Sequence, residues 1–284
     1  MNNIILIGYG YWGKIWEKTI LKNNKCKLIG IVDPILKNNN ISDFDLDSYN
    51  IVVIVCPIKY HFNNCKFFME NNKKILIEKP CCEYLEDIKK LKLIKIENNF
   101  NKIFSVGYVL VYNNCIQKIK NIYLSENKFI NAYFFRSNGN SQVRKDCDII
   151  YDLLCHDIAV ALYIFNCDIN KIDILYVEKN YKTINCIIKF EECICHFYCS
   201  SIDKEKMSYF KFVECEPGKN SYIYNDVTKE YKINNEIKEI NNELSLDSEL
   251  EMFINDDCDG ITDLNFAEKI HIILLNISLF KEIN

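Results

Sequence analysis

The segment YDLLCHDIAVALYIF, which starts at Tyr151, combines an apolar helix pattern with Asp152, His156 and Asp157 in its first half. A carboxylate or an imidazole that is buried without a partner destabilises a fold, so such groups usually serve a purpose. At about 100° per residue, Asp148, Asp152 and His156 fall on one narrow stripe, whereas Asp157 points away from it. An imidazole with a pKa of about 6.5 can accept a proton near neutral pH. We therefore expect Asp152 and His156 to take part in chemistry and Asp157 to be a structural partner.

The hexapeptide GYGYWG fits the fingerprint of a dinucleotide-binding turn. In that reading Gly8 permits the tight turn, Gly10 lets the backbone approach a pyrophosphate, and Gly13 lets helix and strand pack closely. The hexapeptide follows a short apolar run and opens a helical pattern. About 20 residues later, Asp33 ends the second expected strand, where a carboxylate accepts hydrogen bonds from a ribose diol and repels a 2′-phosphate. NAD is therefore favoured over NADP.

Two further strand ends carry polar residues. IVVIVCPIKYH places Pro57 just after a strand and His61 four residues later. ILIEKP ends the next strand with Glu78, Lys79 and Pro80, and ligands of open α/β sheets bind at this edge. His61 could face a cofactor or lie in a first helical turn, and Lys79 could bind a substrate hydroxyl or be a solvated strand end. The local sequence leaves both pairs of alternatives open.

The elements that must position these residues form two blocks. Strands and helices alternate in the first block, which predicts a parallel, doubly wound sheet: strands 4–7, 27–33, 51–57, 73–80 and 102–108, and helices 14–24, 61–72 and 83–99. Strands dominate the second block, which predicts a mostly antiparallel sheet: strands 128–137, 171–178, 183–190, 193–201, 209–216 and 220–225, and helices 113–124, 151–165, 245–256 and 262–280. We expect an α/β protein with a Rossmann dinucleotide-binding domain over residues 1–121 and an α+β domain over residues 122–284.

Composition excludes several classes of function. The 284 residues are 49% hydrophobic with a net charge of -4, and the pI near 5.7 provides no basic field for a nucleic acid. No apolar run approaches the roughly 20 residues that span a bilayer, and the first residues lack the features of a signal peptide. We expect a cytoplasmic protein that binds neither nucleic acid nor membrane.

The 15 cysteines are scattered through apolar segments, where a free thiol behaves as a small hydrophobe. Cys193, Cys195 and Cys199 share one face of an expected strand, while His196 points to the other face. We interpret this group as core packing and expect no metal site.

The motifs GYGYWG, CPIKYH, EKP and DLLCHD, in this order and at these gaps, resemble the glucose-fructose oxidoreductase and inositol dehydrogenase (Gfo/Idh/MocA) family. That family joins a Rossmann domain to a C-terminal α+β domain with an open sheet. GYGYWG, VRKDCDIIYDLLCHDIAVALYIF and SSIDKEKMSYFKF are similar to the branch that acts on nucleotide-linked amino sugars or their uronic acids. In that branch the 3-hydroxyl is oxidised during the biosynthesis of surface polysaccharide sugars.

The resemblance implies an NAD-dependent oxidoreductase that transfers a hydride from a secondary hydroxyl of a sugar nucleotide, a small-molecule partner, to the nicotinamide. A cyclitol dehydrogenase and an NAD-dependent glycosidase are alternatives within the family. A non-catalytic NAD-binding regulatory protein is an alternative from another class. An exposed face on the C-terminal sheet, together with the resemblance, implies a homodimer or homotetramer.

The resemblance also implies the site residues. His156 is expected to be the general base, Asp152 to orient its imidazole or bind substrate, and Lys79 to hold the reacting hydroxyl. The cofactor-binding residues would be Gly8, Tyr9, Gly10, Tyr11, Trp12, Gly13, Asp33, Cys56, Pro57, His61, Glu78 and Lys79. The substrate-binding residues would be Lys79, Tyr108, Arg144, Asp152 and His156, with Arg144 meeting a phosphate or carboxylate and Tyr108 standing where many relatives have His.

Overall fold

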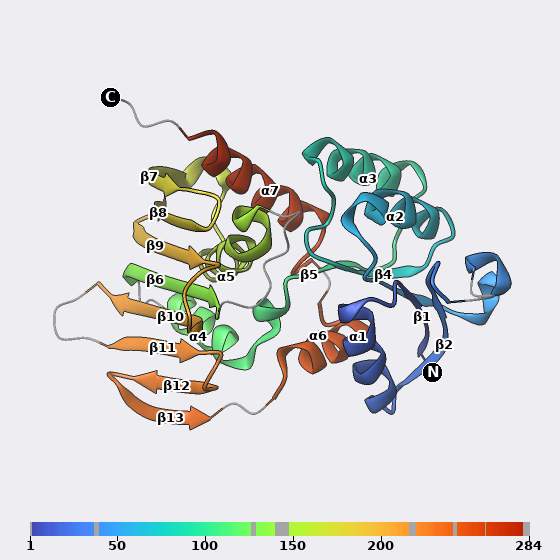
Figure 1. The fold of residues 1–284 in the computed structure, drawn as a ribbon, viewed down its shortest axis with the longest axis horizontal. Helices are drawn as coiled ribbons and strands as arrows, with labels where there is room; N and C mark the ends of the chain where they lie inside the picture. Colours follow the sequence, from blue (N-terminus) through green and yellow to red (C-terminus); the bar gives the residue numbers. More distant parts are fainter. Residues whose placement is uncertain are drawn as a thin grey trace. The chain divides into compact units, whose positions relative to one another are not determined.

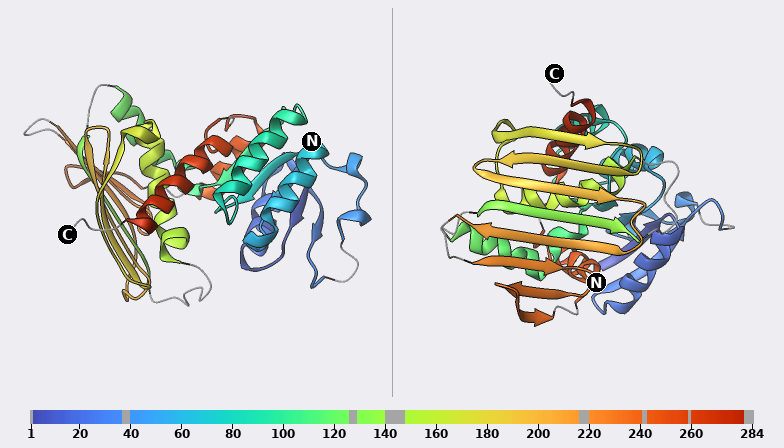
Figure 2. Two further views of the ribbon diagram at one scale, coloured as in Figure 1. Left: turned by 90° about the horizontal axis from the view of Figure 1, so that it is seen from above. Right: turned by 60° about the vertical axis from the view of Figure 1, so that its left-hand side comes forward.

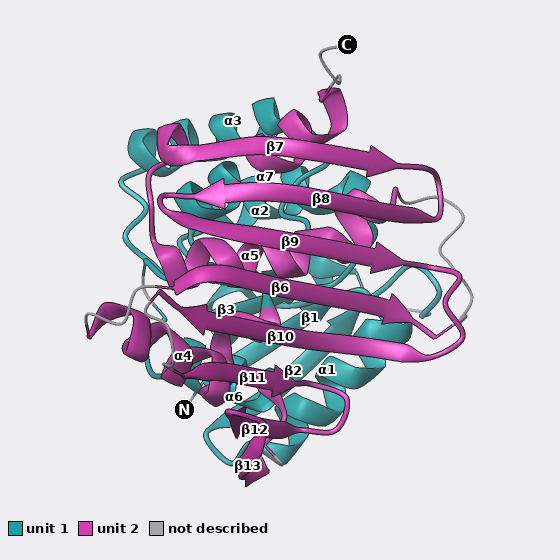
Figure 3. Ribbon diagram, turned by 90° about the vertical axis from the view of Figure 1, so that its left-hand side faces the viewer, with its two compact units in different colours: residues 1–108, 246–269 teal, residues 109–245, 270–284 magenta. Residues whose placement is uncertain are grey.

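The structure, a computed structural model, divides into two compact units (Figures 1 and 3). Unit 1 comprises Met1–Tyr108 and Leu246–Lys269, and unit 2 comprises Val109–Ser245 and Ile270–Asn284. The residues described are 2–36, 40–125, 129–139, 148–215, 220–240, 243–258 and 260–280.

Unit 1 is built on a five-stranded parallel sheet with the order β2-β1-β3-β4-β5. Its strands are β1 Asn2–Ile7, β2 Cys26–Val32, β3 Ile51–Ile54, β4 Lys74–Glu78 and β5 Phe104–Gly107. Helices α1 Tyr11–Lys22 and α6 Ser245–Ile254 lie on one face, and α2 His61–Glu70 and α3 Leu85–Glu97 on the other (Figure 1). Because helices cover both faces, the central strands are continuous apolar runs such as IILI and IVVI. The expected doubly wound sheet is confirmed.

The segment after Ser245 completes unit 1 by long-range contacts. On α6, Asp247 pairs with Lys22 at 2.5 Å, which ties this helix to the end of α1. Further on, Thr262 accepts a hydrogen bond from the Val106 N–H at 2.9 Å and contacts the Ser105 hydroxyl at 2.8 Å, so the segment adds to β5. A single domain boundary after residue 121 was expected from the sequence. The return of residues 246–269 to unit 1 differs from this expectation, because a local pattern does not reveal that a distant segment joins the first sheet.

Unit 2 contains an eight-stranded sheet with the order β13-β12-β11-β10-β6-β9-β8-β7. Its strands are β6 Phe129–Asn138, β7 Ile172–Lys179, β8 Thr183–Phe190, β9 Cys193–Ser200, β10 Lys206–Glu214, β11 Ser221–Asn225, β12 Glu230–Ile233 and β13 Glu236–Ile240. All neighbours are antiparallel except β6 and β9, which run parallel. Its helices are α4 Asn114–Leu124 and α5 Cys155–Phe165, and α7 Leu264–Leu279 begins in unit 1 and belongs to unit 2 from Ile270 onward.

Helices pack on one face of this sheet, and the opposite face carries no helix in the part of the chain that the structure describes (Figure 2). On the open face Tyr133 stacks on His196 with ring centroids 4.9 Å apart, and Phe135 lies beside Tyr209 at 6.1 Å. The helix-covered face holds the core of unit 2, with buried rings at Phe134, Phe190, Phe197, Phe210 and Phe212.

The hairpin of β12 and β13 was not expected from the sequence. Its turn is Asn234 and Asn235, with φ angles of 51° and 68°. Two consecutive residues with positive φ form the two-residue turn that suits a hairpin, and asparagine tolerates this conformation. The NN pair between alternating strands was therefore the signal that could have revealed it.

Asp157 on α5 is the structural residue that the sequence predicts. It is 1% exposed, and its Oδ1 accepts hydrogen bonds from Arg136 Nε at 3.0 Å and Nη2 at 2.5 Å. The Cys199 thiol lies 3.6 Å from its Oδ2. This buried ion pair joins α5 to β6 and β9, the parallel pair at the middle of the sheet.

Two other expectations concern the cysteines and the membrane. Every cysteine among the described residues is a free thiol, and Cys193, Cys195 and Cys199 are buried on β9 as expected. Among the described residues, none of the helices has both the length and the apolar character that crossing a membrane requires.

The buried ion pair gives a prediction of stability. Asp157→Leu should lower the free energy of unfolding by about 3–5 kcal/mol, because it leaves the Arg136 guanidinium buried and unpaired. Urea unfolding measures this loss. The double variant with Arg136→Met should recover most of it, and a loss below about 1 kcal/mol in the single variant would contradict the assigned role.

Candidate active site

The turn after β1 has the geometry of a dinucleotide-binding loop. Gly8 has a φ of 101°, and a Cβ there would lie 2.7 Å from the backbone nitrogen of Cys56. Helix α1 begins at once, and no side chain caps its N-terminus at Gly10. The first N–H groups of an uncapped helix, together with the helix dipole, favour an anionic ligand such as a pyrophosphate.

Asp33 ties this loop to the end of β2. Its Oδ2 accepts a hydrogen bond from the Tyr9 N–H at 2.7 Å, and its Oδ1 accepts one from the Ile35 N–H at 2.9 Å. Each carboxylate oxygen can accept more than one hydrogen bond, so the side chain is fixed and can still accept ribose hydroxyls.

The backbone of the loop is open to a ligand at Gly10. A Cβ at Gly10 would meet no atom within 4 Å, so the backbone is accessible there. Tyr11 and Trp12 at the start of α1 are 78% and 38% exposed, with their rings edge to face at 6.0 Å. The residues of the fingerprint and Asp33 are thus brought together at the carboxyl edge of the sheet.

His61, the first residue of α2, is buried between two loops at the same edge. Its Nε2 lies 2.8 Å from the carbonyl oxygen of Cys56, and its Nδ1 lies 3.0 Å from that of Pro80 and 3.2 Å from that of Cys81. Burial lowers the pKa of His61, an effect larger than the opposing effect of the carbonyl groups. The ring lies between the segments after β3 and β4, and in its neutral form its single N–H can donate to a carbonyl group of only one of them. Burial also raises the pKa of the Cys56 thiol to about 11.

Glu78 ends strand β4, and Lys79 follows it. The Glu78 carboxylate accepts a hydrogen bond from Trp16 Nε1 at 2.9 Å, and its Oε2 lies 3.3 Å from the Lys79 backbone nitrogen. Lys79 is half-buried and precedes a cis peptide bond to Pro80. Tyr108 is buried, with its ring 5.8 Å from that of Phe266 in an edge-to-face contact.

Asp152 and His156 lie in unit 2, on a helix that differs from the expected one. Ile150–Leu154 is a π-helical turn, and α5 begins only at Cys155. Asp152 therefore lies in the wide turn and His156 in the first turn of α5, and both are half-buried. The stripe calculated at about 100° per residue assumed an α-helix throughout, whereas π-turns are wider and occur frequently at functional sites.

The expected site residues are divided between the two units. The cofactor residues, Lys79 and Tyr108 belong to unit 1, and Asp152 and His156 belong to unit 2. Arg144 lies outside the described residues. Among the residues that are described, no group of three or more His, Cys, Asp or Glu side chains is arranged to hold a metal ion.

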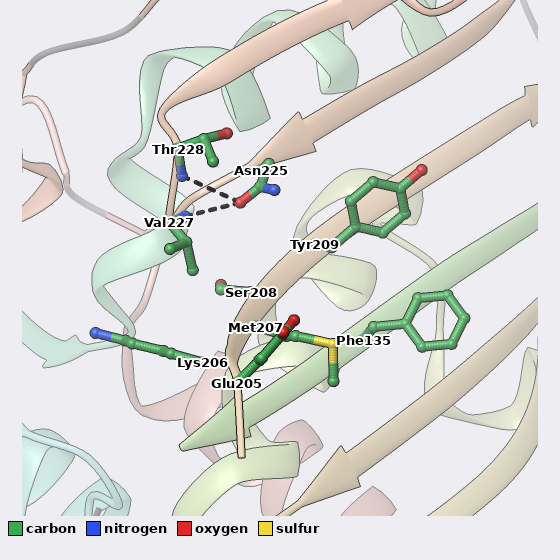
Figure 4. A pocket seen from close by; sticks show the side chains of 9 residues that line it. All are labelled: Phe135, Glu205, Lys206, Met207, Ser208, Tyr209, Asn225, Val227 and Thr228. Atoms are coloured by element: carbon green, nitrogen blue, oxygen red, sulfur yellow. Dashed lines mark hydrogen bonds between the residues drawn. The ribbon is translucent and has the colours of Figure 1, made fainter. Parts of the chain in front are cut away.

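A pocket of about 320 Å³ lies in unit 2 at the start of β10, beside the turn after β11 (Figure 4). The buried Ser208 hydroxyl at its wall has no hydrogen-bond partner among the described residues. The pocket contains none of the site residues expected from the sequence; its lining is Phe135, Glu205, Lys206, Met207, Ser208, Tyr209, Asn225, Val227 and Thr228.

The doubly wound sheet and its glycine loop are those of a dinucleotide-binding fold. Residues 2–108 match the model of an oxidoreductase family with an NAD-binding Rossmann fold. This part of the chain is similar to that family, the family of glucose-fructose oxidoreductase and inositol dehydrogenase that the sequence motifs also resemble. No curated protein sequence is detectably similar to it.

Solved structures share the fold over nearly the whole chain. The UDP-N-acetylglucosamine 3-dehydrogenase of Acidithiobacillus ferrooxidans superimposes with a TM-score of 0.84 at 16% identity, covering 98% of this chain and 96% of its own. A dehydrogenase of Clostridium difficile gives 0.79 at 16% identity, covering 98% of each chain. An NAD-binding protein of Listeria innocua gives 0.73 at 12%, covering 98% of this chain and 96% of its own.

The glycine loop gives a prediction of cofactor binding. Gly10→Ala should leave the melting temperature unchanged, because its Cβ meets no protein atom. It should weaken NADH binding about tenfold, equivalent to about 1.4 kcal/mol, because the Cβ would occupy the space of the pyrophosphate. Calorimetric titration with NADH measures this effect.

Gly8→Ala is the contrasting control. It should lower the free energy of unfolding by more than about 1 kcal/mol, since alanine rarely adopts a positive φ. Undiminished NADH affinity in the folded Gly10→Ala variant would show that the cofactor does not approach this loop.

Proposed function

We propose that the protein is a cytoplasmic, NAD-dependent oxidoreductase that oxidises a secondary hydroxyl, the 3-hydroxyl, of a nucleotide-linked sugar during the biosynthesis of surface polysaccharide sugars. The proposal depends on one observation: the chain contains both the residues of a dinucleotide-binding loop and an Asp–His pair that could catalyse proton transfer. A complete dinucleotide loop lies in unit 1, and Asp152 and His156 lie at a π-helical turn in unit 2.

The cofactor would be held by the loop Gly8–Gly13 and by Asp33. The uncapped start of α1 suits the pyrophosphate, and the Asp33 carboxylate suits the adenosine ribose diol. A 2′-phosphate beside the same carboxylate would be repelled, so NAD is favoured over NADP. The nicotinamide ring supplies the hydride acceptor when the cofactor is bound.

Each side chain of the proposed catalytic set has a separate role in the reaction. His156 accepts the proton of the reacting hydroxyl, because a neutral imidazole is a base near neutral pH. Asp152 orients that imidazole or binds the substrate. Lys79 donates a hydrogen bond to the reacting oxygen and stabilises the negative charge that develops there. Tyr108 and Arg144 would bind other parts of the substrate.

The substrate class is supported by the motif DLLCHD and by one structural likeness. The structure from Acidithiobacillus ferrooxidans carries the name of a UDP-N-acetylglucosamine 3-dehydrogenase, and it is similar over nearly the whole chain. We extend that substrate class to this protein as a proposal. A cyclitol or an aryl glycoside is the substrate of the competing family activities.

The open face of the unit 2 sheet supports a proposal of self-association. Aromatic side chains, Tyr133, Phe135, Tyr198 and Tyr209 among them, remain accessible on this face. Apolar patches of this kind mark interaction surfaces, and we propose a homodimer or homotetramer. Sedimentation velocity should give a dimer or tetramer, and Tyr133→Glu should shift it toward monomer. A monomer at all concentrations of the unaltered protein would contradict this proposal.

The catalytic assignments predict a separation of turnover from cofactor binding. Lys79→Ala and His156→Ala should each lower kcat by about 10²–10⁴-fold, the usual contribution of a positioned acid or base. His156→Ala should bind NADH as the unaltered protein does, and Lys79→Ala should keep most of that affinity, because neither residue contacts the pyrophosphate in this proposal.

The assay is nicotinamide reduction with sugar nucleotides, cyclitols and aryl glycosides, with a 2-oxoacid included to regenerate a tightly held cofactor. Turnover of a sugar nucleotide alone supports the proposal. Turnover of a cyclitol or cleavage of a glycoside favours the competing activities, and NAD binding without turnover favours a regulatory protein. A kcat in either variant that is comparable with that of the unaltered protein would contradict the catalytic role of the substituted residue.

A further inference from the structure

The π-helical turn Ile150–Leu154 lies directly before α5 and carries Asp152. A π-turn holds one residue more than an α-turn and is rare in proteins. The apolar pattern of this segment predicts an ordinary α-helix instead. Specific contacts must therefore favour the π-turn here, and side chains at both of its ends provide them.

Asp148 holds the start of the turn with its side chain and its main chain. Its Oδ1 accepts a hydrogen bond from the Ile150 N–H at 2.9 Å. Its carbonyl oxygen accepts hydrogen bonds from the Tyr151 N–H at 3.0 Å and from the Asp152 N–H at 2.9 Å. The first N–H groups of a helix have no partner within that helix. Asp148 thus accepts hydrogen bonds from three of them.

Cys155 contacts the same turn at its other end. Its thiol donates a hydrogen bond to the carbonyl oxygen of Tyr151, with Sγ 3.0 Å from that oxygen, and lies 3.8 Å from the carbonyl oxygen of Asp152. The backbone N–H of Cys155 donates to the carbonyl oxygen of Ile150, five residues earlier, which is the hydrogen bond of a π-turn. Cys155 therefore contacts the turn through both its backbone and its side chain.

The burial of Cys155 limits what its thiol does. The residue is 0% exposed, so the thiol is not available to a substrate. Alanine or valine would suit an apolar interior as well as a free thiol does, but neither has a donor for the Tyr151 carbonyl group. The hydrogen bond to the turn is thus the property that distinguishes cysteine at this position.

Tyr151, which accepts this hydrogen bond, is also fixed through its side chain. Its ring packs against the ring of His271 on α7, with the centroids 5.7 Å apart. Both residues belong to unit 2. The turn is therefore held to a neighbouring helix by Tyr151, and its hydrogen bonding is completed by Asp148 and Cys155.

The π-turn determines the direction of the Asp152 side chain. Because the turn contains one additional residue, side chains within it and before it are rotated by up to about 100° relative to those of a continuous α-helix. His156 follows the turn and lies in the regular part of α5. Conversion of the turn to an α-helix would thus change the direction of Asp152 relative to that of His156.

We propose that Cys155 is a positioning residue of the candidate active site, whose thiol holds the π-helical turn and thereby the direction of Asp152 relative to His156. The inference rests on the catalytic roles proposed for Asp152 and His156. It deepens that proposal, because it assigns a role to a buried residue of the motif DLLCHD that does not touch the substrate.

The first test compares the turnover of Cys155→Ser and Cys155→Ala. Serine retains a hydroxyl that donates to a carbonyl group four residues earlier, so its kcat should stay within about threefold of that of the unaltered protein. Alanine removes the donor and should lower kcat at least about tenfold, because a small displacement of a catalytic group is costly. The KM for NAD⁺ should change little in both variants, since the cofactor loop lies in unit 1.

Hydrogen exchange tests the turn itself and needs no substrate. Amides of residues 150–157 should exchange at least about tenfold faster in Cys155→Ala and within about threefold of the unaltered rate in Cys155→Ser, because only alanine loses a contact that keeps the turn closed. Cys195→Ala is the matched control, since it removes another fully buried thiol of unit 2, on β9. It should change neither the exchange of these amides nor kcat.

Should Cys155→Ala fail to fold, Cys155→Val removes the donor and still fills the space of the side chain. Serine and alanine (or valine) variants that are alike in exchange and in kcat would overturn the inference, whether both are impaired or both are unchanged. Faster exchange in the alanine variant with an unchanged kcat would overturn it as well.

Absence of turnover in the unaltered protein would instead contradict the proposed function, and with it the catalytic part of this inference. The exchange rates would then still decide whether the thiol holds the turn.

Discussion

Burial of the parallel sheet on both faces is the constraint on which the arrangement of unit 1 depends. With helices on both sides, the interior of β1, β3 and β4 can hold only apolar side chains, and polar groups collect where these strands end. The hydrogen bond from the Tyr9 N–H to Asp33 then joins the first two strand ends, and His61 lies between the segments after β3 and β4, close to a carbonyl oxygen of each. The chemistry of unit 1 is confined to one edge.

Much of this arrangement could be predicted from the sequence, because each part has a local signal. The continuous apolar runs indicate buried parallel strands, and GYGYWG indicates the turn, which Gly8 confirms with its positive φ. The angular separation of Asp157 from His156 indicated a structural role, and its ion pair with Arg136 confirms that role. Local spacing was sufficient wherever the relevant contacts follow from strand or helix periodicity.

Other features depend on contacts or distortions without a local signal. The return of α6 to unit 1 depends on pairs more than 200 residues apart, such as Lys22 with Asp247. The π-helical turn at Asp152 does not alter the apolar pattern from which a helix is predicted. The burial of Glu249 could not be predicted from the sequence either. A single acid between Ser248 and Leu250 is typical of a surface position, and only the packing around α6 shows that it is buried.

Isotope transfer is the most direct test of the proposed movement of a hydride from a sugar carbon to NAD. The protein is incubated with NAD⁺ and with UDP-N-acetylglucosamine that carries deuterium at the 3-carbon. The cofactor is then released by denaturing the protein, and its mass is determined by mass spectrometry. The reduced cofactor that forms, whether bound or released, should carry deuterium on the nicotinamide ring. Formation of the 3-oxo sugar together with reduced cofactor that carries no deuterium would contradict the proposed hydride transfer.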